Sequence, residues 1–251
     1  MVRTPITDEA VLITGGASGI GLSCARQAAA RGARVAIVDI DPAAAERAIT
    51  SLPGDGHVAI GADVTDPAAL RAGADAFAAA GHGITGVVAA AGIVSRSALL
   101  EIDVTEFRRV LDINVIGVQN TIQAAGPHLI RRAPHGSVVV LGSVAAFTGG
   151  GLMGNGAYAT SKAAVIGLMR GYARELAPHP VRVNLVAPGA TETPMTQVLE
   201  EADRDRIRKL SLLGRLSEPE EIASMVGFLL ASDVGTITGQ VVHVNGGVVF
   251  G

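Results

Sequence analysis

The sequence predicts an α/β fold: one doubly wound domain with a parallel sheet of about seven strands and helices on both faces. Two observations predict it. Short apolar runs alternate with long helical stretches, which is typical of right-handed parallel crossovers. The composition is 49% apolar but only 3% aromatic, with 32 glycines, which suits aliphatic strands covered by Ala-rich helices. No linker or repeat marks a boundary, so we expect a single domain over residues 1–251.

Apolar runs, and the Gly and Pro residues that interrupt them, predict the elements in order. The expected strands cover 10–14, 34–39, 57–62, 86–92, 137–141, 181–186 and 240–244. The expected helices end near 31 after a Gly-rich turn, then cover about 42–52, 67–80, 105–131, a stretch from Tyr158 to about 177, and 219–231. Pro219 would open the last helix, with Ser217 as its cap. Residues 190–213 mix charged and apolar side chains and are predicted to form a substrate lid.

Chemistry-bearing residues follow the predicted strands. Gly15, Asp39, Asp63, Gly92 and Ser143 all stand where a strand ends. Because ligands of doubly wound sheets bind outside the carboxyl ends of the strands, we expect these residues to border one crevice.

The turn after the first strand has the glycine spacing Gly15-x-x-x-Gly19-x-Gly21. Glycines let backbone N–H groups approach a phosphate, and the helix N-terminus adds partial positive charge. A plain tight turn is the alternative. Asp39 lies 18 residues beyond Gly21, near the spacing expected of a ribose-binding acid. It could instead cap the next helix, but Asp41, directly before Pro42, suits that role better.

Tyr158 and Lys162 are four residues apart and share one helix face. A phenol titrates near pH 10, so its use as an acid or base near neutral pH requires a shift of about 3 pKa units. One ammonium about 4 Å away supplies an effect of that size. The pair is therefore a candidate acid/base device, although an exposed pair would have the same pattern.

Other functions are disfavoured by charge and residue usage. The net charge is −3 and the basic residues are scattered, so we expect no nucleic-acid partner. The cluster from Arg204 to Lys209 is interleaved with acids and is interpreted as a solvated helix. The start lacks the regions of a signal peptide and no long apolar run occurs, so we expect a cytoplasmic protein without a membrane partner. The lone Cys24 and the dispersed histidines predict no metal site.

Taken in this order, the motifs resemble the short-chain dehydrogenase/reductase family from about Ala10 to Gly247. The motifs that carry the resemblance are Thr14-Gly15-x-x-x-Gly19-x-Gly21, Asp63, Ala91-Gly92, Asn114, Ser143, Tyr158-x-x-x-Lys162, Pro188-Gly189 and Thr193-Pro194-Met195.

The resemblance implies a Rossmann-type dinucleotide-binding and catalytic domain. It implies that Tyr158 is the acid/base and that Ser143 hydrogen-bonds the substrate oxygen. Lys162 would hold the nicotinamide ribose and lower the pKa of Tyr158, while Asn114 would kink its helix and hold a water. The implied cofactor contacts are Gly15, Ser18, Gly19, Ile20, Gly21, Asp39, Asp63, Val64, Ala90, Gly92, Tyr158, Lys162, Pro188, Gly189, Thr191 and Thr193.

Three features depart from the family pattern. Ala89-Ala90 replaces the usual Asn-Asn, so side chains that brace the strand are missing. Asn245 stands where Asp is usual, and the 15-residue separation of Ser143 from Tyr158 is about two longer than usual. These departures concern the substrate pocket more than the chemistry.

We expect an NAD(H)-dependent oxidoreductase that interconverts a secondary alcohol and a ketone. The candidate pocket residues favour a hydrophobic substrate; they are Val144, Ala145, Phe147, Leu152, Met153, Met195, Val198 and Leu199. One alternative is the 3-ketoacyl-thioester reductase of fatty acid synthesis, for which the Arg204 to Lys209 cluster would dock an acidic carrier. Another is a non-catalytic NAD-binding regulator. The resemblance and the apolar segment 241–250 predict a homotetramer.

Overall fold

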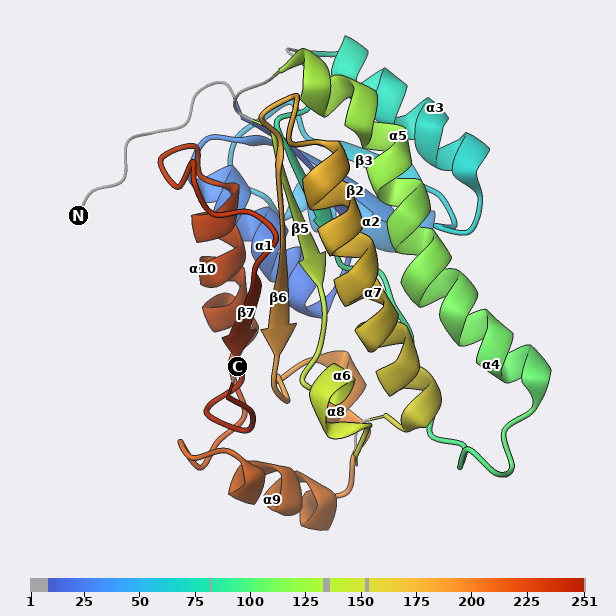
Figure 1. The fold of residues 1–251 in the computed structure, drawn as a ribbon. Coiled ribbons are helices and arrows are strands. Elements are labelled where there is room, and N and C mark those ends of the chain that lie inside the picture. Colours follow the sequence, from blue (N-terminus) through green and yellow to red (C-terminus); the bar gives the residue numbers. More distant parts are fainter. Residues whose placement is uncertain (1–8, 82, 133–135, 152–153, 251) are drawn as a thin grey trace.

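A seven-stranded parallel sheet forms the centre of the computed structural model, which describes residues 9–81, 83–132, 136–151 and 154–250 (Figure 1). The strand order is β3-β2-β1-β4-β5-β6-β7, and every neighbouring pair is parallel. The strands are β1 (Ala10–Thr14), β2 (Arg34–Asp39), β3 (Val58–Gly61), β4 (Gly86–Ala89), β5 (Ser137–Leu141), β6 (Arg182–Pro188) and β7 (Val241–Val244). The strand order reverses between β1 and β4, which creates the crevice predicted at the carboxyl edge. The predicted fold class is confirmed.

Helices cover both faces of this sheet. They are α1 (Gly19–Ala30), α2 (Pro42–Thr50), α3 (Pro67–Ala79), α4 (Val104–Leu111), the π-helix η1 (Asp112–Ile116), α5 (Gly117–Arg131), α6 (Ala145–Thr148), α7 (Gly156–Glu175), α8 (Pro194–Gln197), α9 (Glu201–Leu210) and α10 (Pro219–Leu230). The helices α6, α8 and α9 lie beyond the carboxyl ends of the strands (Figure 1).

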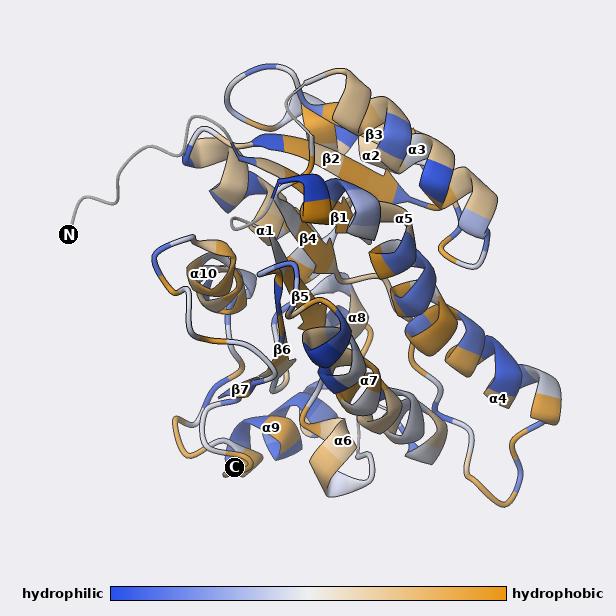
Figure 2. Ribbon diagram, turned by 45° about the horizontal axis from the view of Figure 1, so that its top comes forward, coloured by the Kyte–Doolittle hydropathy of each residue, from blue (hydrophilic) through white to orange (hydrophobic). Residues whose placement is uncertain are grey.

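Strand alternation divides the core into two layers. Leu12 of β1 packs in the layer that includes α3, α5 and α7, whereas its neighbours Val11 and Ile13 pack with α1, α2 and α10. Every residue of β1, β4, β5 and β6 is buried, as expected of parallel strands covered on both faces. The central strands are accordingly hydrophobic, and the polar residues lie on the outer helices (Figure 2). Cys24 is 4% exposed and packs in the second layer.

Two local predictions were inaccurate. The expected helix over 105–131 is interrupted by η1, where one wider turn re-aims the side chains that follow. The cap of α10 is Glu218 rather than Ser217, because Pro219 is the first helical residue and the cap directly precedes it. Glu218 forms a capping box with Glu221, while the Ser217 N–H donates to the Ala190 carbonyl. In the described residues, no helix combines the length and apolarity needed to cross a membrane.

Candidate active site

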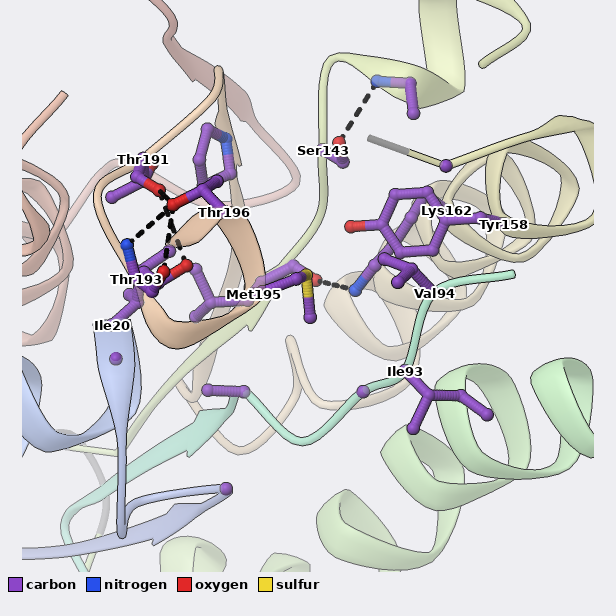
Figure 3. A pocket seen from close by; sticks show the side chains of 18 of the residues that line it. Ile20, Ile93, Val94, Ser143, Tyr158, Lys162, Thr191, Thr193, Met195 and Thr196 are labelled. Carbon is purple, nitrogen blue, oxygen red and sulfur yellow. Dashed lines mark hydrogen bonds between the residues drawn. The ribbon is translucent and has the colours of Figure 1, made fainter. Parts of the chain in front are cut away.

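A cleft of about 780 Å³ lies over the carboxyl ends of the strands. Its walls come from the turn after β1, the ends of β2, β4 and β5, the start of α7, the segment after β6, and α9. All of the predicted cofactor residues line it, as do Ser143, Tyr158 and Lys162. Figure 3 shows Tyr158 and Lys162 on one side of this cleft and Thr191, Thr193 and Thr196 on the other. The topology has thus brought together segments that are far apart in the sequence.

The Gly-rich turn is packed so tightly that glycine is required. Gly15 has a φ of +65°, and a Cβ there would lie 2.7 Å from the Cα of Ala91. A Cβ on Gly21 would collide with the Gly15 carbonyl. The turn delivers the N-terminus of α1 to the cleft, and Ser18, its N-cap residue, makes no side-chain cap hydrogen bond. The first-turn N–H groups of α1 are therefore available to an anionic group such as a pyrophosphate.

Asp39 ends β2 beside this turn. Its Oδ2 accepts a hydrogen bond from the Ala17 N–H at 3.3 Å, and its Oδ1 accepts one from the Asp41 N–H at 3.3 Å. Asp41 caps α2 through the N–H groups of Ala43 and Ala44, as predicted, which leaves Asp39 to line the cleft. A carboxylate at this place can accept hydrogen bonds from ribose hydroxyls, so the residues present fit a dinucleotide.

Asp63 and Val64 follow β3 and line the same end of the cleft. The Asp63 Oδ1 accepts hydrogen bonds from both the N–H and the hydroxyl of Thr65 at 2.8 Å, so the carboxylate also shapes its own turn. The carbonyl of Val64 accepts from Asn120 Nδ2 at 2.9 Å, which ties the turn to α5. The backbone at this end is therefore fixed from beneath.

Tyr158 and Lys162 lie on the first two turns of α7. Asn155 caps this helix through the Ala157 N–H. Lys162 is 5% exposed; its Nζ donates to the Leu141 carbonyl at 2.8 Å and lies 5.7 Å from the centroid of the Tyr158 ring. Because Leu141 ends β5, this bond fixes α7 against the strand that leads to Ser143. Lys162 is therefore buried and is not part of an exposed surface pair.

Burial controls the ionisation of both groups. It raises the pKa of Tyr158 above its usual range, while an interaction with the Ser143 side chain acts in the opposite direction. The resemblance implied that Lys162 lowers this pKa. That effect of Lys162 remains a prediction; in the structure, burial of the phenol is the largest influence on its pKa. Burial also lowers the pKa of Lys162 to about 8. Near neutral pH the phenol is therefore protonated and can act as a proton donor.

The long connection between Ser143 and Tyr158 is accommodated by glycines. Gly149, Gly150 and Gly151 have φ values of +76°, +118° and +157°, so the extra residues form a loop that other residues would rarely adopt. Next to it, a Cβ on Gly154 would lie 2.7 Å from the Cδ1 of Tyr158. The backbone therefore touches the face of the Tyr158 ring. Residues 152 and 153, two predicted pocket residues, lie outside the described residues.

Asn114 lies in η1, behind the cleft wall. It is 0% exposed and does not line the cleft. Its Oδ1 accepts from the Ile93 N–H at 2.8 Å, and its Nδ2 donates to the Ile93 carbonyl and to Ser161 Oγ, both at 2.9 Å. Asn114 thus braces the chain after β4. The side chains of Ala89 and Ala90 cannot form such hydrogen bonds. The helix distortion expected at this residue is present, and the water-holding role remains a prediction.

Asn245, the third departure from the family pattern, also has a structural function. Its Oδ1 accepts from the Gly247 N–H at 2.8 Å and its Nδ2 donates to the Val249 carbonyl at 2.9 Å. A Cβ on Gly189 would lie 2.9 Å from the Cα of Asn245. Asn245 therefore stabilises the turn after β7 and lines the cleft opposite the end of β6.

The predicted substrate pocket is only partly correct. Val144, Ala145 and Met195 line the cleft, but Phe147, Val198 and Leu199 do not. Phe147 instead packs edge-to-face on His243, with ring centroids 4.7 Å apart, and Val198 is 69% exposed. Sequence reasoning missed several lining residues because their orientation depends on tertiary packing; they are Ile93, Val94, Arg109, Ile207, Leu210 and Val248.

Two short helices, α8 and α9, form within the predicted lid segment. Within α9 the cations are paired with acids: Arg206 with Asp203, and Arg208 with Glu201 and Asp205. This confirms a solvated helix for those residues. Arg204 differs, because it is 15% exposed and, besides Glu201 of its own helix at 3.6 Å, is paired with Glu192 outside the helix.

Comparisons with known proteins agree with this geometry. A family model described as enoyl-(acyl carrier protein) reductase matches residues 15–249. The chain is 39% identical over 246 residues to the (3R)-3-hydroxyacyl-CoA dehydrogenase of Mus musculus, covering 94% of each chain. It is 36% identical over 243 residues to the 3-oxoacyl-[acyl-carrier-protein] reductase of Thermotoga maritima, covering 95% of this chain and 96% of that protein.

A solved structure has the same fold. A short-chain type dehydrogenase/reductase from Mycobacterium marinum matches with a TM-score of 0.91 and 33% identity, covering 99% of this chain and 98% of that chain. Since sequence and fold agree over nearly the whole length, the chain belongs to the short-chain dehydrogenase/reductase family of oxidoreductases.

Proposed function

We propose that this protein is an NAD(H)-dependent oxidoreductase that interconverts a secondary alcohol and a ketone, with Tyr158 as the acid/base. The observation that carries the proposal is the convergence of Ser143, Tyr158 and Lys162 at one end of a cleft whose other end holds the Gly-rich turn and Asp39. This supports one bound dinucleotide that spans the cleft and presents its nicotinamide end to the tyrosine.

A bound nicotinamide cofactor would supply or accept the hydride. In ketone reduction the Tyr158 hydroxyl donates its proton to the carbonyl oxygen, and in alcohol oxidation the phenolate accepts the proton back. The Ser143 hydroxyl donates a hydrogen bond to the same oxygen. Lys162 Nζ keeps one proton on the Leu141 carbonyl at 2.8 Å and has two more for a ribose hydroxyl and the tyrosine oxygen.

The preference for NAD over NADP rests on charge. Asp39 lines the cleft where an adenosine ribose would lie, and Ile40, the next residue, is an apolar side chain that is 70% exposed. Neither Ile40 nor Ser18 offers a cation for a 2′-phosphate. A carboxylate therefore faces the extra charge of NADP without compensation.

A hydrophobic substrate without a phosphate-bearing carrier is supported by the lid. Met195, Ile207, Leu210 and Val248 give the cleft an apolar wall. The α9 guanidinium groups that could dock an acidic carrier are paired with carboxylates within the protein. The names of two relatives keep a 3-ketoacyl thioester as the second candidate substrate. The presence of Asn114, Ser143, Tyr158 and Lys162 argues against a non-catalytic regulator.

Steady-state turnover tests this proposal. The purified chain is assayed with NADH or NADPH against 2-octanone, acetophenone and acetoacetyl-CoA, with Tyr158→Phe as the control for adventitious activity. We expect NADH oxidation with a neutral ketone at a higher kcat/KM than with acetoacetyl-CoA. A preference for acetoacetyl-CoA would establish the second candidate, and equal rates for the wild type and Tyr158→Phe would refute the tyrosine mechanism.

A further inference from the structure

Arg204 connects two segments of the cleft wall. It lies on α9, but its Nη2 donates to both carboxylate oxygens of Glu192 at 2.7 Å, and its Nη1 donates to the Thr196 carbonyl at 3.2 Å. Both acceptors belong to the segment 191–196 that follows β6. In the part of the chain that the structure describes, no other α9 guanidinium has a carboxylate partner outside that helix.

The segment 191–196 borders the cleft and contains several internal hydrogen bonds. The hydroxyl of Thr196, a residue 2% exposed, has one proton to share between the carbonyls of Thr191 and Thr193, at 2.8 and 2.9 Å, and accepts from the Thr193 N–H at 2.9 Å. Thr191 and Thr193 line the cleft, and Figure 3 shows this threonine network beside Met195. Thr191 and Thr193, which face the cleft, are therefore bonded to Thr196, and Glu192 lies between them in the chain.

The other end of the connection carries substrate-facing residues. Ile207 and Leu210 line the cleft from α9, three and six residues beyond Arg204. Arg204 is 15% exposed and Glu192 28% exposed, so solvent screens this pair less than the surface pair of Arg206, which is 69% exposed. The guanidinium uses Nη2 for the Glu192 carboxylate and Nη1 for the Thr196 carbonyl. Charge-assisted hydrogen bonds of this kind are strong, whereas an exposed pair contributes little.

We infer that Arg204 is a positioning residue that couples cofactor binding at the 191–196 segment to the placement of α9 over the substrate. The inference rests on the proposed function only in requiring that NAD(H) bind in the cleft. When the cofactor orders Thr191 and Thr193, the Glu192 carboxylate and the Thr196 carbonyl hold α9 in the position that completes the apolar wall. Substrate affinity then depends on this pair, while the proton-transfer geometry of Tyr158 does not.

The test is hydrogen exchange measured by mass spectrometry, with and without saturating NADH, together with steady-state kinetics on the preferred ketone of the panel above. In the wild type we expect NADH to slow exchange in 191–196 and in 201–210. In Arg204→Gln the protection of 191–196 should persist and that of 201–210 should be lost, with KM for the ketone raised about tenfold and kcat within about twofold.

Matched variants separate coupling from a loss of folding. Arg206→Gln removes the same charge from the same helix and should leave exchange and KM at wild-type values. Arg204→Lys keeps the charge but has only one nitrogen for Glu192 and the Thr196 carbonyl. Its protection of 201–210 and its KM should therefore lie between those of the wild type and of Arg204→Gln. The charge swap of Arg204→Glu with Glu192→Arg should recover part of the protection lost in each single variant.

Equal NADH-induced protection of 201–210 in the wild type and in Arg204→Gln would overturn the inference, as would an equal loss in Arg206→Gln. Wild-type protein that oxidises NADH with a ketone but shows no protection of 201–210 would also overturn it and leave the proposed function intact. Wild-type protein that does not bind NADH at all would refute the proposed function itself.

Discussion

Replacing Asp39 tests the placement of the cofactor most directly. The double variant Asp39→Ser with Ile40→Arg removes the carboxylate and adds a cation at a position that is 70% exposed. Serine keeps an oxygen that can accept from the Ala17 N–H, the bond that ties Asp39 to the Gly-rich turn at 3.3 Å. The turn should therefore persist, and the main change is electrostatic.

The magnitude follows from Coulomb's law. A 2′-phosphate of charge about −2, about 5 Å from the Asp39 carboxylate, is repelled by about 6 kcal/mol at an effective dielectric of about 20. Solvent and salt reduce this to about 2 to 3 kcal/mol, because the site is open to water. That range corresponds to an approximately 30- to 150-fold preference of the wild type for NAD(H). The variant should lose this preference and favour NADP(H).

The assay is kcat/KM with NADH and NADPH at one fixed ketone concentration, repeated at low and at high salt. Asp55→Ser is the control, because it removes the same charge from an exposed turn outside the cleft and should leave the ratio unchanged. Wild-type enzyme that uses the two cofactors equally well would refute the placement of Asp39 on the ribose. A variant that loses activity with both cofactors equally would show that Asp39 acts through the turn and not through charge.

Three further predictions follow from the site. Tyr158→Phe should lower kcat by at least about a hundredfold while the Kd for NADH, measured by fluorescence, changes less than about threefold, because the variant removes the transferable proton but little surface; activity within tenfold of wild type would contradict the acid/base role. The Tm of Lys162→Met relative to the wild type should fall as the pH rises from about 8 to about 10.5, because burial lowers the pKa of Lys162 to about 8, so the charged form destabilises the wild-type fold below that value, while the unfolded chain loses this proton only near pH 10.5. A Tm difference independent of pH would rule out this cause. Light scattering should give a homotetramer, which would cover the half-exposed β7 and Phe250, 79% exposed; a mass near the 25.4 kDa of one chain would disprove it.

Sequence patterns alone predicted the order of strands and helices along the chain. They also singled out most of the residues that line the site. The fold class follows from apolar runs and Gly or Pro breaks, which are local signals. The pair of Tyr158 and Lys162 and the role of Asp41 as a cap are also local, because helical spacing and capping chemistry act within one turn. Asp39 could be singled out because another acid satisfied the local cap. Each of these predictions depends on residues close together in the chain.

Tertiary structure decided what depends on contacts between distant segments. No sequence spacing indicates that Asn114 would brace Ile93, since these hydrogen bonds join two segments 21 residues apart in the chain. The spacing of Tyr158 and Lys162 does not show that burial raises the pKa of Tyr158, because desolvation depends on how completely the folded chain surrounds the phenol. Phe147 was assigned to the pocket because it is apolar, but it packs on His243 of β7. Arg204 looked like its helical neighbours in sequence, and only the approach of α9 to the segment after β6 gave it Glu192 as a partner.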